Sequence, residues 1–323
     1  MFKTGTKFFI VSFLVLLSSV ALFIYKYPVV SRDFRLNIKP GYGNIKVQKE
    51  IQKLHVVKYR KLFDLSIRSY FKLSKKKYIK GEYHIKKNLS IYGIINQLTK
   101  VALHKIFVAE GLTIYQIMEI IKADPYTVGD IDVDVEEGEL MPDTYIVANG
   151  DSKNSVVLHM QKCMKSFIAE EWKRRDKTVF LKNSKEALIL ASVIQKEASG
   201  DEQSMVAGVF MNRLHKRIRL SSCSSVIYCI SEYGKKKFNR RLSLKQLHTD
   251  CPQNTYRKYG LPSTAISCPG RDAILATLHP VHTKNLYFVS NGNGKHIFSN
   301  NFELHKKQKQ IYNNRKKTCQ DTK

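Results

Sequence analysis

The feature that most constrains this chain of 323 residues is an uncharged apolar run close to its N-terminus. Residues 8–25 contain no charged side chain and are rich in Phe, Leu, Val and Ile. A helix of that length rises about 27 Å, close to the roughly 30 Å hydrocarbon core of a bilayer. The run predicts one membrane-spanning helix within a 1–30 anchor segment, with all later residues on one side of the membrane.

Two other interpretations of this run stay open. A cleaved signal peptide would have an apolar segment of about 7–15 residues, followed by small residues at the cleavage site. Here the run is longer, and Leu22-Phe23-Ile24-Tyr25 is a poor cleavage context. A buried helix of a soluble domain is disfavoured, because the run is apolar on every face and lies at the extreme N-terminus.

Composition and charge exclude several classes of protein. Hydrophobic residues make up 43% and charged residues 25%, which argues against a mostly disordered chain. The 55 Lys and Arg residues against 27 Asp and Glu give a net charge of +28, which points to an anionic partner. A nucleic acid is the weakest candidate, because Lys dominates over Arg and neither zinc-ligand spacing nor an RNA-binding aromatic motif occurs.

The cysteines leave two possibilities open. There are six, and none forms a Cys-x-x-Cys pair, so a zinc ribbon is not expected. Several of them cluster between residues 223 and 268. If this part of the protein is exported, an intradomain disulfide can form, whereas the alternative is a set of small buried residues without a bond. Spacing alone cannot give the connectivity.

Hydrophobic periodicity divides the rest of the chain into two α+β parts. Residues 33–108 mix short helical and strand patterns and hold 18 basic residues against 4 acidic ones. We therefore expect a small basic module at 31–104 and a larger domain at 105–323, with its core at about 184–305. Near the C-terminus, Asn291-Gly292-Asn293-Gly294 predicts a hairpin turn.

The helix expected over Ser184–Ala198 carries the residue that stands out chemically. Glu197 follows Leu190 and Ile194 at helical spacing, which places its carboxylate on the apolar face. A carboxylate on a buried face is costly unless it is paired or protonated. The protonated form is the one that a general acid needs, so Glu197 is the candidate acid. The alternative is a structural salt bridge to Arg213.

Short segments on both sides of this helix resemble a known family. The segments are, in order, EGLT at 110–113, LMPDTY at 140–145, LASVIQKE at 190–197, VAGVFMNRL at 206–214, NTY at 254–256, GLP at 260–262, PG at 269–270, HP at 279–280, LYFV at 286–289 and HIF at 296–298. Together they are similar, in the same order, to the motifs of the endolytic murein transglycosylases, the MltG or YceG-like family. The resemblance covers most of the chain.

The resemblance implies an α+β protein with a single N-terminal transmembrane helix. It implies a LysM-like module at 31–104 and a catalytic domain at 105–323 that faces the periplasm from the inner membrane. The implied reaction cleaves nascent glycan strands between N-acetylmuramic acid and N-acetylglucosamine and leaves a 1,6-anhydro end, as a terminase of strand elongation. The implied partners are peptidoglycan strands, membrane lipid around 8–25 and cell-wall synthases, with no metal, cofactor or nucleic acid.

In this resemblance the family's catalytic glutamate corresponds to Glu197. Ordinary glycosidases need two carboxylates, but a lytic transglycosylase works with one. The acid first protonates the leaving glycosidic oxygen, and the resulting carboxylate then takes the proton of the sugar's own C6 hydroxyl. Polar and aromatic side chains suit amide-bearing sugars. The candidates for holding the substrate are Asn212, Ser221, Ser222, Asn254, Thr255, Tyr256 and Tyr287.

Two departures from the family pattern keep a second function open. The family has Glu where this chain has Gln195, so a helper carboxylate is absent there. The family reads roughly LQSDPTVIYG where residues 220–229 read LSSCSSVIYC. The alternative is therefore a peptidoglycan-binding or scaffold protein of the same fold, with weak or no catalytic activity.

Overall fold

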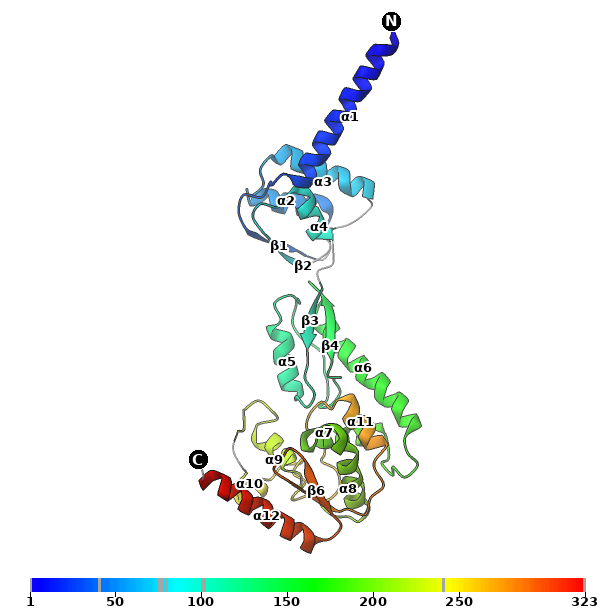
Figure 1. Cartoon of the computed structure of the whole chain (residues 1–323), viewed down its shortest axis with the longest axis vertical. Coiled ribbons are helices and arrows are strands. Elements are labelled where there is room, and N and C mark those ends of the chain that lie inside the picture. Colours follow the sequence, from blue (N-terminus) through cyan, green and yellow to red (C-terminus); the bar gives the residue numbers. More distant parts are fainter. Residues whose placement is uncertain are drawn as a thin grey trace. The chain divides into compact units, whose positions relative to one another are not determined.

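The computed structural model describes residues 2–39, 42–74, 78, 81–99, 103–239 and 242–321. Its backbone contacts separate two compact units, each described by itself below (Figure 1). Unit 1 consists of residues 1–105, 125–129 and 146–152, and unit 2 consists of residues 106–124, 130–145 and 153–323.

Unit 1 starts with a helix, continues as a βααβ arrangement and ends with a further helix. These elements are α1 (Phe2–Lys26), β1 (Phe34–Ile38), α2 (Asn44–Lys53), α3 (Arg60–Ser74), β2 (Gly81–Ile85) and α4 (Ile91–Thr99). β1 and β2 pair antiparallel, with Phe34 opposite Ile85 and Ile38 opposite Gly81. Alternate residues of β1 are buried, and they meet the apolar faces of the helices in one core that includes Ile51, Phe63, Ile67, Ile91 and Leu98.

α1 covers the apolar run at the N-terminus. Several of its large apolar side chains are exposed: Phe9, Phe13, Leu14, Val15, Leu16, Val20 and Leu22. Among the residues that the structure describes, no helix is both long enough and apolar enough to cross a membrane, so the predicted span is not confirmed.

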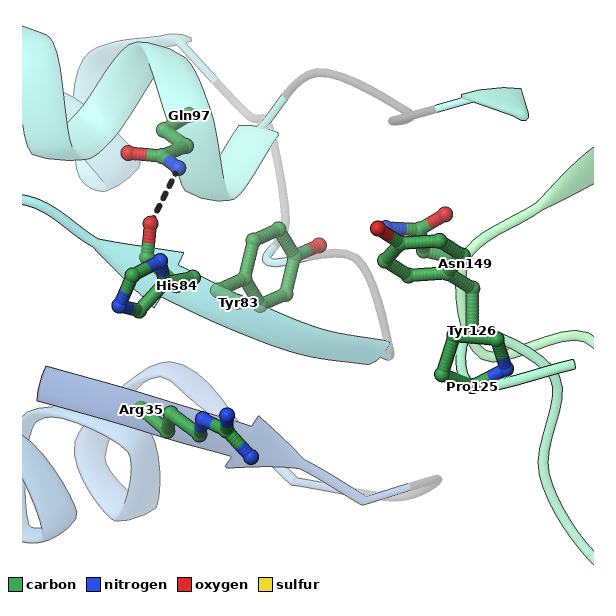
Figure 2. Close-up of a pocket in the computed structure, with 7 residues that line it drawn as sticks. All are labelled: Arg35, Tyr83, His84, Gln97, Pro125, Tyr126 and Asn149. Carbon is green, nitrogen blue, oxygen red and sulfur yellow. Dashed lines mark hydrogen bonds between the residues drawn. The ribbon is translucent and has the colours of Figure 1, made fainter.

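Unit 1 also contains a cavity of about 410 Å³ (Figure 2). Its lining residues are Arg35, Tyr83, His84, Gln97, Pro125, Tyr126 and Asn149. The amide of Gln97 donates a hydrogen bond to the carbonyl oxygen of His84 at 3.1 Å, which ties α4 to β2. No residue predicted to act on substrate lines this cavity, because all of them belong to unit 2.

Unit 2 is built mainly of helices, with four short strand segments, two of which belong to strands that continue into unit 1. Its elements, together with the remaining strands, are β3 (Leu103–Phe107), α5 (Ile114–Ala123), β4 (Thr144–Ala148), α6 (Lys153–Arg174), α7 (Ser184–Glu197), η1 (Gly200–Glu202), α8 (Gln203–His215), α9 (Cys223–Ile230), α10 (Leu244–Leu247), α11 (Arg271–Leu278), β5 (Tyr287–Ser290), β6 (His296–Ser299) and α12 (Phe302–Asp321). β3 pairs with β4, and both strands contribute residues to each unit. The predicted hairpin is confirmed, because β5 and β6 pair antiparallel across residues 291–295.

The helix α7 lies at the centre of the unit 2 core. The asparagine before it, Asn183, caps its N-terminus by accepting a hydrogen bond from the N–H of Glu186 at 2.9 Å. The stretch 187–194 is buried and packs against α8 and α11. Gly208 on α8 is required there, since a Cβ atom would stand 2.2 Å from the carbonyl oxygen of Val281. The sequence prediction of this helix is confirmed to within one residue.

Candidate active site

Glu197 is the last residue of α7, and two serines at the start of α9 hold its carboxylate. Oε1 of Glu197 accepts hydrogen bonds from the hydroxyl of Ser222 at 2.5 Å and the hydroxyl of Ser224 at 2.8 Å. The backbone N–H of Ser224 is a third donor, at 3.4 Å. Because the side chain of Glu197 is half-buried, the site presents one partly accessible carboxylate with a fixed orientation.

The position at the end of α7 modifies the expectation for Glu197. The helix stops there because Ala198 has an extended backbone, with φ −145° and ψ 160°. The buried stripe therefore ends at Ile194, and Glu197 emerges from the core instead of lying within it. A group that exchanges protons with a polymer has to be reached from outside, so this position suits the predicted role.

Arg213 does not form the salt bridge that was the alternative role for Glu197. Its guanidinium donates to the carbonyl oxygens of Leu220 and Leu286, both at 2.6 Å. It also lies over the ring of Tyr287, with 5.3 Å from the guanidinium carbon to the ring centroid. No ion pair joins Arg213 to Glu197 within the part of the chain that the structure describes. Burial lowers the pKa of Arg213, and the neighbouring acidic groups, Glu197 among them, partly offset this effect.

Thr255 organises the serine loop, which is the segment 221–225 at the start of α9. Its hydroxyl accepts a hydrogen bond from the backbone N–H of Ser222 at 2.9 Å and lies 2.9 Å from the hydroxyl of Ser225. Its carbonyl oxygen accepts from the N–H of Ser221 at 3.1 Å. Ser221 has a φ of 50°, an unusual conformation for a residue other than glycine. Thr255 is fully buried, so it fixes the backbone that presents Ser222 to Glu197.

Tyr256 contacts the start of α9. Its hydroxyl lies 3.2 Å from the sulfur of Cys223, and burial raises the pKa of Tyr256 above its ordinary value. The structure thus brings five predicted residues together, namely Glu197, Ser221, Ser222, Thr255 and Tyr256.

Two predicted amides are engaged with the backbone. Asn254 is completely buried and donates to the carbonyl oxygens of Leu247 at 3.0 Å and Thr249 at 2.7 Å. Asn212 donates to those of Thr283 at 2.7 Å and Asn285 at 3.0 Å. Through these contacts both side chains hold neighbouring backbone segments in place, and their role in binding sugars stays a prediction.

Tyr287, on β5, stacks on another ring. Its ring lies parallel to the imidazole of His305, with centroids 5.2 Å apart and an interplanar angle of 22°. Arg213 lies on it as well, so Tyr287 is linked to the loop of Glu197 through this guanidinium. Its part in substrate binding stays a prediction.

Comparison with known proteins identifies the family. The profile of the YceG-like family matches residues 36–311 of this chain. The chain belongs to the YceG-like family. This confirms the resemblance drawn from the sequence motifs.

Relatives of this YceG-like protein carry an informative name. An endolytic murein transglycosylase from Bacillus subtilis (strain 168) is 29% identical over 312 residues, which is 86% of this chain and 84% of the relative. A protein of the same name from Streptococcus pneumoniae serotype 2 is 29% identical over 174 residues, which is 52% of this chain and 31% of the relative. A crystal structure of a YceG-like protein from Listeria monocytogenes is similar with a TM-score of 0.54 and 25% identity, covering 85% of this chain and 98% of that one.

Gln195, the first departure from the YceG-like pattern, has a structural contact in this protein. Its amide oxygen accepts a hydrogen bond from the N–H of Gly270 at 2.8 Å, at the start of α11. An amide oxygen accepts such a bond as a carboxylate does. A Cβ atom at Gly270 would stand 1.9 Å from Oε1 of Glu110, so a larger residue there would displace the Glu110 carboxylate. The replacement therefore preserves the connection between α7 and this turn.

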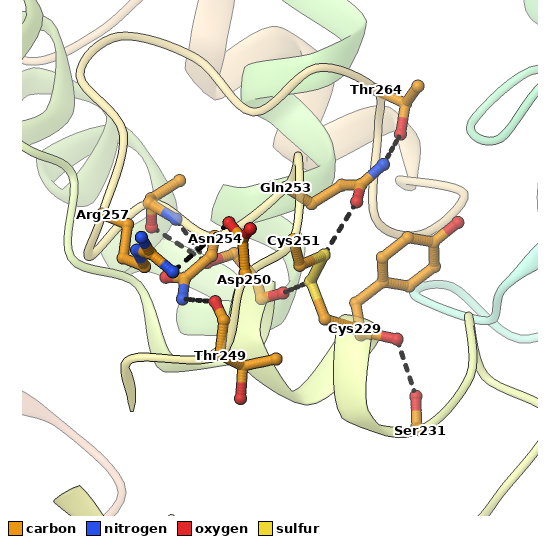
Figure 3. The surroundings of a disulfide bond; sticks show 12 residues. Cys229, Ser231, Thr249, Asp250, Cys251, Gln253, Asn254, Arg257 and Thr264 are labelled. Carbon is orange, nitrogen blue, oxygen red and sulfur yellow. Dashed lines mark hydrogen bonds and ion pairs between the residues drawn. A yellow bond between two sulfur atoms is a disulfide. The ribbon is translucent and has the colours of Figure 1, made fainter. Parts of the chain in front are cut away.

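The altered loop of this YceG-like protein still serves Glu197. Where the family pattern has Asp and Pro, this chain has Cys223 and Ser224, and Ser224 provides two of the three donors to Oε1. At the end of the pattern, Cys229 stands where the family has Gly. The structure pairs Cys229 with Cys251 in a disulfide (Figure 3).

This disulfide settles which interpretation of the cysteines applies. It joins α9, which carries Ser224, to the segment that runs on to Thr255. The helix and the residue that fixes Ser222 are therefore linked by a covalent bond. Among the described cysteines, Cys163, Cys223 and Cys268 are not bonded to another sulfur. One intradomain disulfide was one of the two options that the sequence left open.

Glu137 is a site residue that the sequence did not reveal. Its carboxylate accepts hydrogen bonds from the N–H of Ile114 and the hydroxyl of Tyr228, both at 2.9 Å. Tyr228 belongs to α9, so Glu137 ties the helix that bears the serine donors to the N-terminus of α5. Burial raises the pKa of Glu137 to about 7. The only signal in the sequence was its place in an acidic stretch, which is equally typical of a solvated surface.

This raised pKa predicts a pH-dependent contribution of Glu137 to stability. The ordinary pKa of the group is 4.5, so between pH 4.5 and 7 the folded protein holds a proton that the unfolded chain has released. The stabilisation is complete below pH 4.5 and is lost as the pH rises to 7. The shift of the pKa corresponds to about 3 kcal/mol of unfolding free energy.

The Glu137→Gln variant should lack this dependence, because an amide does not titrate. As the pH rises from 4.5 to 7, the parent should lose about 3 kcal/mol of unfolding free energy that the variant does not lose. The unfolding free energy of the variant minus that of the parent should therefore rise by this amount. Urea unfolding of both proteins at a series of pH values measures the difference. A difference that stays constant from acid to neutral pH would contradict the prediction.

Proposed function

We propose that this protein is an endolytic murein transglycosylase. It cleaves the bond between N-acetylmuramic acid and N-acetylglucosamine in nascent glycan strands and leaves a 1,6-anhydro end, and so terminates strand elongation. The observation that carries the proposal is the carboxylate of Glu197, partly accessible and held by Ser222 and Ser224, in a chain whose relatives bear this name.

The geometry supplies what this reaction requires. Protonated Glu197 donates its proton to the glycosidic oxygen, and the bond from that oxygen to the anomeric carbon breaks. The oxygen of the C6 hydroxyl then bonds to the anomeric carbon, and its proton passes to Glu197. The acid is regenerated and no water is consumed. The donors on Oε1 favour the carboxylate that exists between the two steps.

A non-catalytic peptidoglycan-binding protein of the same fold is the second candidate. The observation that favours it is the altered loop at 220–229 together with the engagement of Asn212 and Asn254 by backbone carbonyls. Incubation of purified glycan strands with the full chain separates the two candidates. We expect soluble fragments from the transglycosylase, whereas strands that co-sediment with the protein and stay uncut would favour the second candidate.

We further propose the setting in which the enzyme acts. The exposed apolar side chains of α1 support an anchor in the inner membrane, with the body in the periplasm. The order β1, α2, α3, β2, with the strands paired antiparallel, supports a LysM-like module that binds glycan. Synthases that make the nascent strands are candidate partners at this location.

The anchor makes a direct prediction about fractionation. The full chain should stay with the membranes after an alkaline carbonate wash, because the apolar side chains of α1 would lie in lipid. A variant that lacks residues 1–26 should be released. Immunoblots of pellet and supernatant provide the measurement, and a full-length chain that appears in the supernatant would contradict the anchor.

A further inference from the structure

Ser224 has no place in the predicted site, yet it makes the most extensive contact with Glu197. We propose that Ser224, at the N-terminal end of α9, is a positioning residue that fixes Oε1 of Glu197 and so assigns both proton transfers to Oε2. This inference rests on the proposed transglycosylase reaction and deepens it.

The asymmetry of the carboxylate is the first step. All three donors, two from Ser224 and one from Ser222, reach Oε1. Oε2 of Glu197 accepts no hydrogen bond from any residue that the structure describes. A proton on Oε1 would point at these donors, whereas a proton on Oε2 leaves every one of them in place. The acid therefore carries its proton on Oε2.

The two hydroxyls form a closed triangle with Oε1. They lie 2.6 Å from each other, in addition to their contacts with Glu197. Each hydroxyl has a single proton to donate, and Oε1 of the carboxylate has none. Every arrangement of the two protons within the triangle therefore directs at least one of them to Oε1. The triangle holds Oε1 at both stages of the reaction.

The helix end strengthens this contact for the charged form. The N–H of Ser224 belongs to the first turn of α9, where N–H groups have no partner within the helix. Such groups carry the positive end of the helix dipole and stabilise an anion close to them. Ser224 thus supports the carboxylate with a hydroxyl and with the helix end at the same time.

α9 is itself fixed on three sides, so its donors are organised in advance. Thr255 binds the N–H of Ser222 before the first turn, Glu137 binds Tyr228 near the last turn, and the disulfide holds Cys229. Donors that are fixed in advance cost no reorganisation when charge develops on the acid. The serine loop can therefore act on Glu197 without a movement of the helix.

The test compares Ser224→Ala with Ser224→Thr, which keeps the hydroxyl. Loss of a hydrogen bond to a charged group should lower kcat about tenfold, with KM changed by less than about twofold. Because the carboxylate loses a donor, the basic limb of the pH–rate profile should move up by about one pH unit. Ser224→Thr should restore both values. The other groups that face the site, Arg213, Tyr256 and Cys223, are the same in all variants.

Ser231→Ala is the matched control. Ser231 lies at the opposite end of α9, where its hydroxyl donates to the carbonyl oxygen of Tyr228 at 3.1 Å. This variant should keep the parent kcat and pH profile. A folded Ser224→Ala protein with the kcat and pH profile of the parent would overturn the proposal.

A second measurement separates this inference from the proposed function. Carbon-13 NMR follows the ionisation of Glu197 directly, whether or not strands are cleaved. The midpoint should lie at higher pH in Ser224→Ala than in the parent. If the parent forms no anhydro ends but the midpoint moves, the reaction is wrong and the role of Ser224 stands. If the midpoint does not move, the role of Ser224 is wrong.

Discussion

Glu197→Gln should abolish most strand cleavage and leave a folded protein that binds glycan. The amide has the size of the carboxyl group, and its oxygen can still accept hydrogen bonds from Ser222 and Ser224. It cannot donate a proton to the glycosidic oxygen and take one back from the C6 hydroxyl. General acid–base catalysis typically raises a reaction rate by a factor of about 10²–10⁴, so we expect kcat to fall by at least a factor in this range. The release of soluble fragments gives the rate, and thermal unfolding checks the fold.

Glu186→Gln is the control on the same helix. Glu186 lies in the first turn of α7, where its carboxylate accepts a hydrogen bond from the N–H of Lys182 at 2.7 Å. This variant should cleave strands at the parent rate, as should Glu202→Gln, which tests the contact of Glu202 with His296. Cleavage by Glu197→Gln at a rate near that of the parent would remove Glu197 from the mechanism.

Removal of the disulfide should lower the stability of the protein. Replacement of Cys229 and Cys251 by Ser opens a loop with a sequence separation of 22 residues. A cross-link that closes a loop of this size lowers the conformational entropy of the unfolded chain, which is worth about 3 kcal/mol. Without the bond, the unfolding free energy should fall by that amount. Cleavage should fall too, because the link between α9 and the Thr255 segment is lost. Urea unfolding and strand release measure the two effects.

Cys163→Ser provides the control for this pair. Cys163 lies on α6 and has no disulfide partner, so its replacement should change stability little. A reducing agent should have the effect of the double variant on the parent and no further effect on the double variant. Equal unfolding free energies for the parent and the double variant would show that the bond does not stabilise the fold.

The sequence predicted well what depends on local pattern. The apolar periodicity of 184–198 and the asparagine and glycine pairs at 291–294 predict the helix α7 and the β5–β6 hairpin, and both are confirmed. The position of Glu197 at the end of its helix followed less directly. A stripe indicates which face a residue occupies, but the point where a helix ends depends on the chain that follows.

Contacts between distant segments could not be predicted in the same way. Asn212 and Asn254 are polar enough to bind a sugar, but polarity alone cannot distinguish a sugar from a backbone carbonyl as the partner. Ser224 is one of several serines in a row, and only the direction of the first turn of α9 aims its N–H at Glu197. Six cysteines allow many pairings, and only the fold brings Cys229 beside Cys251.

The mass of the cleaved strand ends tests the central claim most directly. Purified glycan strands would be digested by the full chain in water labelled with heavy oxygen, and the products analysed by mass spectrometry. The proposed reaction predicts ends that are one water molecule lighter than hydrolysed ends and that carry no heavy oxygen, because the C6 hydroxyl attacks the anomeric carbon. Ends that carry the heavy oxygen would show hydrolysis and contradict the role given to Glu197.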